Sequence, residues 1–476
     1  MKFTLCLVCM LYILSSPAQS TKAELQKNIQ NRYSEYAGIA KEIWDYAEVG
    51  FQEYKSSRLL KNLLSKEGFS IQDSVAGMPT AFIASFGSGK PVIAILGEYD
   101  ALPGISQDNT PQLNILDSKT AGHACGHHLF GTASAAACIE VKNWLRTTKQ
   151  SGTIRFYGTP AEEGGSGKVY MVREGLFKDV DAVLHWHPGD ENNASTASSL
   201  ANKTGKFKFY GVASHASASP ERGRSALDGV EAMDAMVNMM REHVPSDTRI
   251  HYVITRGGEA PNVVPAYAEV YYYVRHPKAE LVISIWERIE KAAQGAALGT
   301  ETRIEVEVIG GVYNIVSNSA LAKIMDKNLR ATGGYAYNAE EKLFAEKIQS
   351  GFRAQSMEKL ESTSEIKPFI LSESPFPAST DVGDISWVVP TVGLSTATWV
   401  PGTAAHSWQA VAAGGIGIGF KGMMVAAKTL TGTAIDLFTE PQHIEQAWQE
   451  LKSRRGASFV YKPMLGSRKP ALDYRK

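Results

Sequence analysis

The stretch VIAILGEYD at residues 92–100 decides how this chain folds. Its apolar residues predict a strand buried on both faces, and two carboxylates, Glu98 and Asp100, follow where that strand ends. The same pattern of an apolar run followed by ionisable residues occurs twice more, in Ile154–Tyr157 with Glu162 and Glu163, and in Ala182–Leu184 with His185 and His187. Because ligand sites of open α/β sheets gather at the carboxyl ends of strands, these three ends predict one shared site.

Helical patterns lie around and between these strands. Residues 21–48 and 53–68 carry spaced apolar positions among charges, which predicts amphipathic helices. An Ala/Gly-rich stretch from Trp408 to about Leu430 predicts a long helix that can pack closely on a sheet. Strands alternating with helices favour an α/β fold, with a central mixed sheet between helical layers.

A different order of elements occupies residues 205–312. Strand and helix patterns follow one another there as βαββαβ, the order of a ferredoxin-like unit, over Lys206–Val212, Ala226–Glu242, Ile250–Thr255, Ala268–Val274, Glu280–Ala297 and Thr302–Ile309. A chain of 476 residues exceeds the ~250–300 residues that one core usually serves. We therefore expect two domains, a discontinuous one made of 21–204 and 313–476 and an inserted one at 205–312.

Charge and the first twenty residues limit the classes of function. Lys plus Arg equals Asp plus Glu, at 49 each, so there is no net field to attract nucleic acid. Residues 1–20 have a charged start, an apolar stretch and a small-residue exit, which predicts a signal peptide and a secreted or periplasmic protein. The apolar stretch, Phe3–Leu14, is too short for a membrane span, so we do not expect an integral membrane protein. Past this segment only Cys125 and Cys138 remain, which argues against a disulfide framework.

The segment HACGHH at residues 123–128 is a candidate metal motif. Cys125 and His127 lie two apart before a predicted helix, where both can face one ion, and thiolate with imidazole suits Zn²⁺. Adjacent Glu162 and Glu163 could divide two tasks, one as a metal ligand and the other as a general base. The alternatives are loop histidines beside a buried thiol, and a solvated acidic pair at a helix start.

Further candidates come from single residues. Of His185 and His187, one is expected to be a ligand and the other its neighbour, while His406 lies in a loop ahead of a helix. Three residues of the inserted unit could touch a substrate or its oxyanion: His215, Asn262 and Arg275. Taken alone, each of the three is more simply explained by a structural role.

The motifs occur together and in order, as GEYDALPG, AGHACGHH, TPAEEGGSGK, DAVLHWHP, GVASHASASP, GGEAPNVVP, STDVGDISW and PGTAAHSWQ. In this the chain resembles the aminoacylase-like metallopeptidase family and, within it, the p-aminobenzoyl-glutamate hydrolase branch. The resemblance implies a catalytic α/β domain with two divalent metal ions, Mn²⁺ or Zn²⁺. It also implies an inserted ferredoxin-like lid through which two chains form a homodimer.

The resemblance assigns roles residue by residue. It implies five metal ligands, with the first of them bridging: Cys125, His127, Glu163, His187 and His406. Glu162 would be the general base, Asp100 would steady a ligand imidazole, and Arg275 would hold a substrate carboxylate. His215 and Asn262 would contact the substrate or oxyanion, the histidine in the partner subunit's site. His128 is expected beside the ligand His127, behind the metal, although relatives carry Asp or Asn at this position. The role of Glu98 stays open.

Together these features predict hydrolysis of an amide bond by metal-activated water with a glutamate base. The expected substrate is an N-acyl amino acid, an aminobenzoyl-glutamate-like compound or a dipeptide, with a free carboxylate. Two alternatives stay open: a hydrolase that uses Cys125 as a nucleophile, and a binding protein that keeps the fold without turnover.

Overall fold

The apolar run of residues 92–97 forms the centre of a six-stranded mixed sheet. The computed structural model describes residues 17–353 and 358–475. The sheet order is β1 (Ser70–Asp73), β2 (Phe82–Ser88), β6 (Gly152–Gly158), β3 (Val92–Gly97), β7 (Ala182–Leu184) and β15 (Thr391–Val392). Within this sheet β2 runs antiparallel to the other strands. All six residues of β3 are buried, so helices cover both faces of the sheet, and the predicted α/β fold is confirmed.

Helix α4 (His127–Thr148) is the main helix against this sheet, and it packs on β2, β3, β6 and helix α12 (Gly417–Thr439). Around them lie α1 (Pro17–Asn31), α2 (Tyr33–Tyr46), α3 (Tyr54–Lys66), α5 (Gly167–Arg173), α8 (Ser319–Thr332), α9 (Ala339–Ser350), α10 (Val382–Ser386), α11 (Trp408–Gly414) and α13 (Gln442–Arg455). Two predicted helices were wrong in extent. The first is divided at Arg32 into α1 and α2, and the long one is α11 and α12, with a 73° bend between them.

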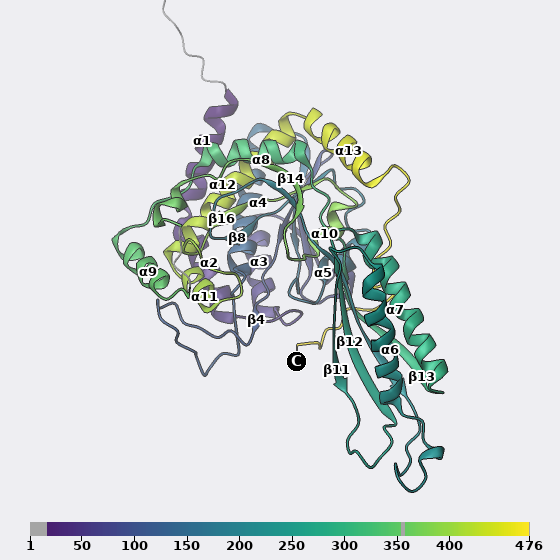
Figure 1. The fold of residues 1–476 in the computed structure, drawn as a ribbon. Helices are drawn as coiled ribbons and strands as arrows, with labels where there is room; N and C mark the ends of the chain where they lie inside the picture. Colours follow the sequence, from purple (N-terminus) through teal and green to yellow (C-terminus); the bar gives the residue numbers. More distant parts are fainter. Residues whose placement is uncertain (1–16, 354–357, 476) are drawn as a thin grey trace, which may run out of the picture.

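A second sheet projects from the main body (Figure 1). It has the order β11 (Arg249–Arg256), β12 (Tyr267–His276), β10 (Ala201–Tyr210) and β13 (Arg303–Val312), and all its pairs are antiparallel. Helices α6 (Ala226–Met240) and α7 (Ala279–Gly299) pack on one face. The chain order of these elements is βαββαβ, and β10 begins four residues before the predicted boundary at 205. The role of this unit as a lid and dimerisation domain stays a prediction.

The first residues of the chain lie largely outside the structure. Of the predicted signal peptide, residues 1–16 are outside the described residues, and α1 begins at Pro17. Among residues 17–353 and 358–475, no single helix is both long and apolar enough to cross a bilayer. Helices α11 and α12 pass that test only as a pair, across their bend.

Candidate metal centre and active site

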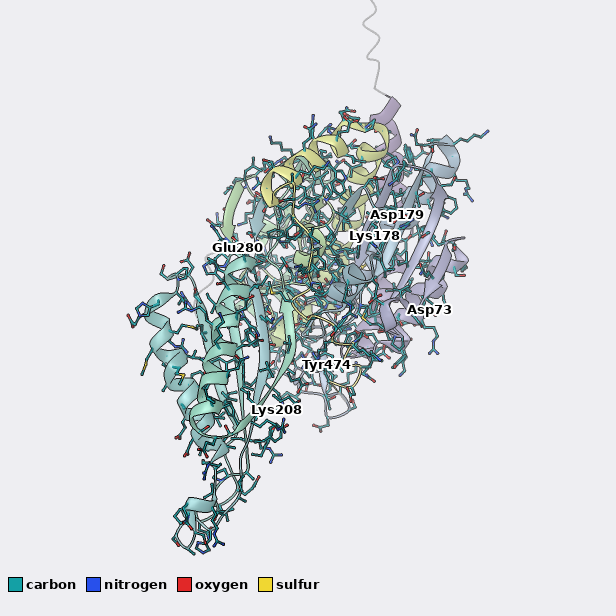
Figure 2. The ribbon with its side chains drawn as sticks, turned by 90° about the vertical axis from the view of Figure 1, so that its right-hand side faces the viewer. Asp73, Lys178, Asp179, Lys208, Glu280 and Tyr474 are labelled. Carbon is teal, nitrogen blue, oxygen red and sulfur yellow. The ribbon has the colours of Figure 1, made fainter. Side chains whose placement is uncertain are left out.

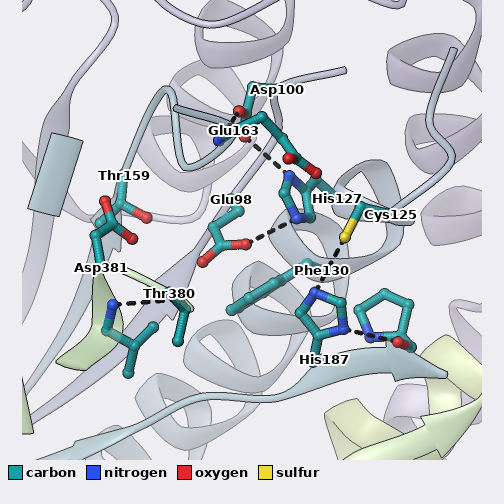
Figure 3. A network of polar contacts seen from close by, with 12 residues as sticks. Glu98, Asp100, Cys125, His127, Phe130, Thr159, Glu163, His187, Thr380 and Asp381 are labelled. Carbon is teal, nitrogen blue, oxygen red and sulfur yellow. Dashed lines mark hydrogen bonds and ion pairs between the residues drawn. The ribbon is translucent and has the colours of Figure 1, made fainter. Parts of the chain in front are cut away.

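The parallel strands β3, β6 and β7 bring their carboxyl ends to one edge of the sheet. Register pairs Gly97 of β3 with Gly158 of β6, and Ile95 with Leu184 of β7. The residues that follow these strands therefore meet, as the sequence predicted. Figure 3 shows carboxylates and imidazoles from these ends gathered around the thiol of Cys125.

Three groups of side chains have ligand atoms that all lie within 4.8 Å of one another. They are Cys125 with His127 and His187, Cys125 with Glu163 and His406, and Glu98 with His127 and Glu162. Cys125 belongs to two groups, and together these two contain all five ligands that the resemblance implies. The chain turns into α4 at Gly126, whose φ is +77° and where an added Cβ would lie 2.6 Å from Pro188. Only glycine allows the loop that carries Cys125 to lie this close to the segment that carries His187.

His127 is held from both sides by carboxylates. Its Nδ1 lies 2.9 Å from Asp100 Oδ1, and its Nε2 lies 3.1 Å from Glu98 Oε2. A carboxylate on Nδ1 accepts the ring proton there and leaves Nε2 free as a ligand atom. Burial alone would lower the pKa of this imidazole, but Glu98, Cys125 and Asp100 raise it well above its usual value. Asp100 thus occupies the steadying position that the resemblance implies.

The other two histidines of the cluster come from segments further along the chain. His187 opens β8 (His187–Gly189); its Nδ1 donates to Pro188 O at 2.7 Å, which leaves Nε2 facing Cys125 Sγ at 3.4 Å. His406 adopts a left-handed backbone with φ +59°, and its Nε2 lies 3.3 Å from Glu163 Oε1. A bulky residue held in this region is strained, and such strain is concentrated at functional sites.

Several buried polar atoms of the cluster have no hydrogen-bond partner among the described residues. They include Glu98 Oε2, His127 Nε2 and Glu163 Oε1, which lie within ion-pair distance of neighbouring cluster atoms. Leaving such atoms unpaired is costly, and divalent cations between them would satisfy them. A donor set of thiolate, imidazole and carboxylate suits Zn²⁺ or a similar transition metal. The residues present therefore fit a metal centre.

The Glu162–Glu163 turn is held by carboxylates from other parts of the chain. Ala161 N donates to Glu53 Oε1 at 2.8 Å, and Glu163 N donates to Asp100 Oδ2 at 2.9 Å. Burial, followed by the charges of Glu98 and Glu163, raises the pKa of Glu162 well above its usual value. A glutamate with a raised pKa is a stronger base near neutral pH than an exposed one.

Sequence reasoning missed a buried lysine behind the cluster. Lys168 Nζ lies 2.7 Å from both Glu98 Oε1 and Asp381 Oδ1, and all three side chains are buried. Burial would lower the pKa of Lys168, but Asp381 and Glu98 raise it above its usual value. The signal was present in GKVYM at residues 167–171, where a lysine precedes the apolar residues of α5. Glu98 is thus shared between Lys168 and the imidazole of His127.

His128 and His185 lie outside the three groups. The structure places His128 under α11, where its Nε2 lies 2.9 Å from Gly414 O, and its ring centroid lies 4.8 Å from that of His123. Burial lowers the pKa of His128 well below its usual value, so the ring is neutral. His128 thus joins α4 to α11 through its contact with Gly414, and its expected place behind His127 stays a prediction. His185 is neutral for the same reason, because burial lowers its pKa to about 3.

The three candidate residues of the inserted unit, Arg275, His215 and Asn262, lie at its two ends. Arg275, near the end of β12, stacks on Tyr273 with 4.6 Å from guanidinium carbon to ring centroid. Burial is the main cause of the raised pKa of Tyr273, and the charge of Arg275 opposes it. His215 and Asn262 are exposed in loops beyond the other end of the sheet, and the structure does not bring them to this chain's cluster (Figure 1).

Comparison with known proteins identifies the family. The model of Peptidase family M20/M25/M40 matches residues 94–410. A p-aminobenzoyl-glutamate hydrolase polypeptide of Escherichia coli is 42% identical over 87% of this chain and 91% of its own. The human Xaa-Arg dipeptidase is 28% identical over 87% of this chain and 88% of its own.

Solved structures agree with this fold. The aminobenzoyl-glutamate utilization protein of Klebsiella pneumoniae has a TM-score of 0.60 at 17% identity, over 87% of this chain and 98% of its own. A dinuclear metal binding peptidase of the M20 family from Bacillus subtilis has a TM-score of 0.58 at 17% identity, over 86% and 99%. The chain therefore belongs to Peptidase family M20/M25/M40 and is a metal-dependent hydrolase of that family.

Proposed function

We propose that this chain hydrolyses the amide bond of p-aminobenzoyl-glutamate or a closely similar N-acyl amino acid, with two divalent ions, Mn²⁺ or Zn²⁺. The observation that carries the proposal is the pair of ligand groups that share Cys125. The name of the Escherichia coli relative supplies the substrate class, and the guanidinium of Arg275 is the candidate partner for the free carboxylate of that substrate.

The ions, when bound, would polarise the amide carbonyl and lower the pKa of a water molecule at the site. Glu162 would take a proton from that water and later return it to the leaving amine. Asp100 keeps His127 in the tautomer that leaves Nε2 free. Glu98, between Lys168 and His127, holds the opposite side of the ring.

The exposed loops at the far end of the second sheet belong to the same proposal. The loops that carry His215 and Asn262 are joined by a backbone contact, in which Ala216 N donates to Asn262 O at 3.0 Å. In a homodimer formed through the inserted unit, these loops would reach the cluster of the second chain and donate to the oxyanion. We further propose that residues 1–20 direct export of the chain.

Removal of metal should abolish activity. A chelator removes the metal ions from the ligand groups. We therefore expect hydrolysis of p-aminobenzoyl-glutamate to stop, and to return when Mn²⁺ or Zn²⁺ is added. Burial raises the pKa of the Cys125 thiol, which disfavours the thiolate that a cysteine nucleophile needs. Activity that survives the chelator would support the cysteine mechanism instead. If p-aminobenzoyl-glutamate, acyl amino acids and dipeptides all stay intact with either metal, a binding role is favoured.

Replacing Arg275 should weaken binding of the substrate carboxylate. Arg275→Met keeps an unbranched apolar stem and removes the guanidinium and its charge. We therefore expect KM to rise about 10- to 100-fold, as for the loss of a charge-assisted pair worth ~1.5–3 kcal/mol. The control is an amide of the same substrate without the free carboxylate, whose KM should differ little between variant and parent. Equal losses on both substrates would mean that Arg275 only supports the sheet.

A further inference from the structure

Residues 456–475, which we call the strap, follow α13 and form neither helix nor strand. Two consecutive residues of the strap enter two different cores. Met464 is buried in the core of the inserted unit, and Leu465 is buried in the core of the main body. At Gly311 of β13 an added Cβ would lie 2.7 Å from Met464 Cβ, so the contact is close. The strap therefore joins the two parts of the molecule.

Beyond this point the strap follows α5 toward the site. Arg173 donates to Arg468 O at 2.6 Å, and the guanidinium of Arg468 in turn donates to Ile309 O of β13. Further on, Gln52 Nε2 donates to Leu472 O at 2.7 Å. Side chains from the main body thus hold the strap through its backbone carbonyls on both sides of residue 470.

The last described residues of the strap contact the Glu162–Glu163 turn. The hydroxyl of Tyr474 and the guanidinium of Arg475 both donate to Glu163 O, at 3.0 and 2.9 Å. The ring of Tyr474 packs edge-on against Phe51, with centroids 5.6 Å apart. Figure 2 shows Tyr474 on the side of the main body that faces the second sheet.

The turn itself needs this support. Ala161 and Gly164, on either side of the glutamate pair, have φ of +56° and +91°, and the alanine is strained in that region. Asp100 accepts a hydrogen bond from the backbone N–H of Glu163, and the two strap residues donate to the backbone carbonyl of the same residue. Without them Glu163 O loses two donors that come from outside the turn.

We infer that Tyr474 and Arg475 are positioning residues of the hydrolytic site, which hold the Glu162–Glu163 turn so that Glu163 faces the metals while Glu162 faces the substrate. Neither residue touches the ligand atoms, and both act through the backbone of Glu163. Since the strap is also anchored in the inserted unit, the position of that unit and the geometry of the catalytic turn are coupled.

The test uses the full chain loaded with Mn²⁺ or Zn²⁺. The double variant Tyr474→Phe with Arg475→Met removes both donors to Glu163 O. It keeps the aromatic ring at position 474 and most of the apolar stem at position 475. Because two hydrogen bonds are lost, we expect kcat to fall at least about tenfold, with KM changed less than about twofold. Chelator-driven metal release, followed without substrate, should be faster by about tenfold, because Glu163 is less well held.

Asp473→Asn is the matched control, since Asp473 is exposed between the same contacts; it should leave kcat and metal release unchanged. Tyr474→Phe alone keeps the packing on Phe51 and should give part of the effect if the double variant folds poorly. The kcat measurement rests on the proposed function, whereas metal release does not, so a chain without hydrolytic activity still tests the strap. Parental kcat and parental release in the folded double variant would overturn the inference.

Discussion

Glu162→Gln should reduce kcat by about 10²- to 10⁴-fold while the metal content stays near that of the parent. The amide has nearly the shape of the carboxylate, but it cannot accept the proton of the attacking water or return it to the amine. Glu162 is the member of the pair that stays outside the two ligand groups sharing Cys125. Initial rates on p-aminobenzoyl-glutamate, with metal analysis of the same sample, check both parts.

The neighbouring residue supplies the comparison. Glu163→Gln should lose metal together with activity, because Glu163 belongs to the group with Cys125 and His406. Of these two adjacent residues, Glu162 would then be the general base and Glu163 a metal ligand. The structure also places Glu162 in a group with Glu98 and His127. Loss of metal in Glu162→Gln would therefore assign Glu162 to the ligands and leave the base to another residue.

The sequence predicts the sheet and the cluster well because both depend on local pattern. The apolar runs that became β3, β6 and β7 are continuous, and parallel pairing brings the residues after them together. Helix limits were less accurate where the predicted helix was carried through glycines. The bend between α11 and α12 comes at Gly415 and Ile416, inside the stretch GGIGIG at residues 414–419, whose glycines are a local signal for a helix end that the prediction did not use.

What the sequence could not predict depends on contacts between distant segments. The Lys168–Asp381 pair joins residues 213 apart, and the contact of Tyr474 with Glu163 joins residues 311 apart. His128 shows the converse, because two residues that are adjacent in sequence can point to different parts of the structure. It follows His127 directly in the sequence, but its position on α4 directs its side chain toward Gly414.

Lys168→Met should destabilise the folded chain by about 3–5 kcal/mol, the usual result of removing one partner from a buried ion pair. The methionine fills the space of the lysine stem but leaves two buried carboxylates, Glu98 and Asp381, without the cation between them. Unfolding in denaturant, followed on the metal-free chain, measures the change without a contribution from bound ions. Lys61→Met is a matched control, because its pair with the half-exposed Asp73 should contribute no more than ~1 kcal/mol.

A second substitution separates charge from packing. Lys168→Met combined with Asp381→Asn removes one of the two unpaired charges, so part of the lost stability should return. If the lysine mattered only for packing, the added Asp381→Asn change would give no recovery, because it restores no volume. A loss below about 1 kcal/mol in Lys168→Met would mean that water or a proton compensates these carboxylates. Glu98 also faces His127, so the positive charge of Lys168 opposes the effect of burial, which raises the pKa of this carboxyl beside the imidazole.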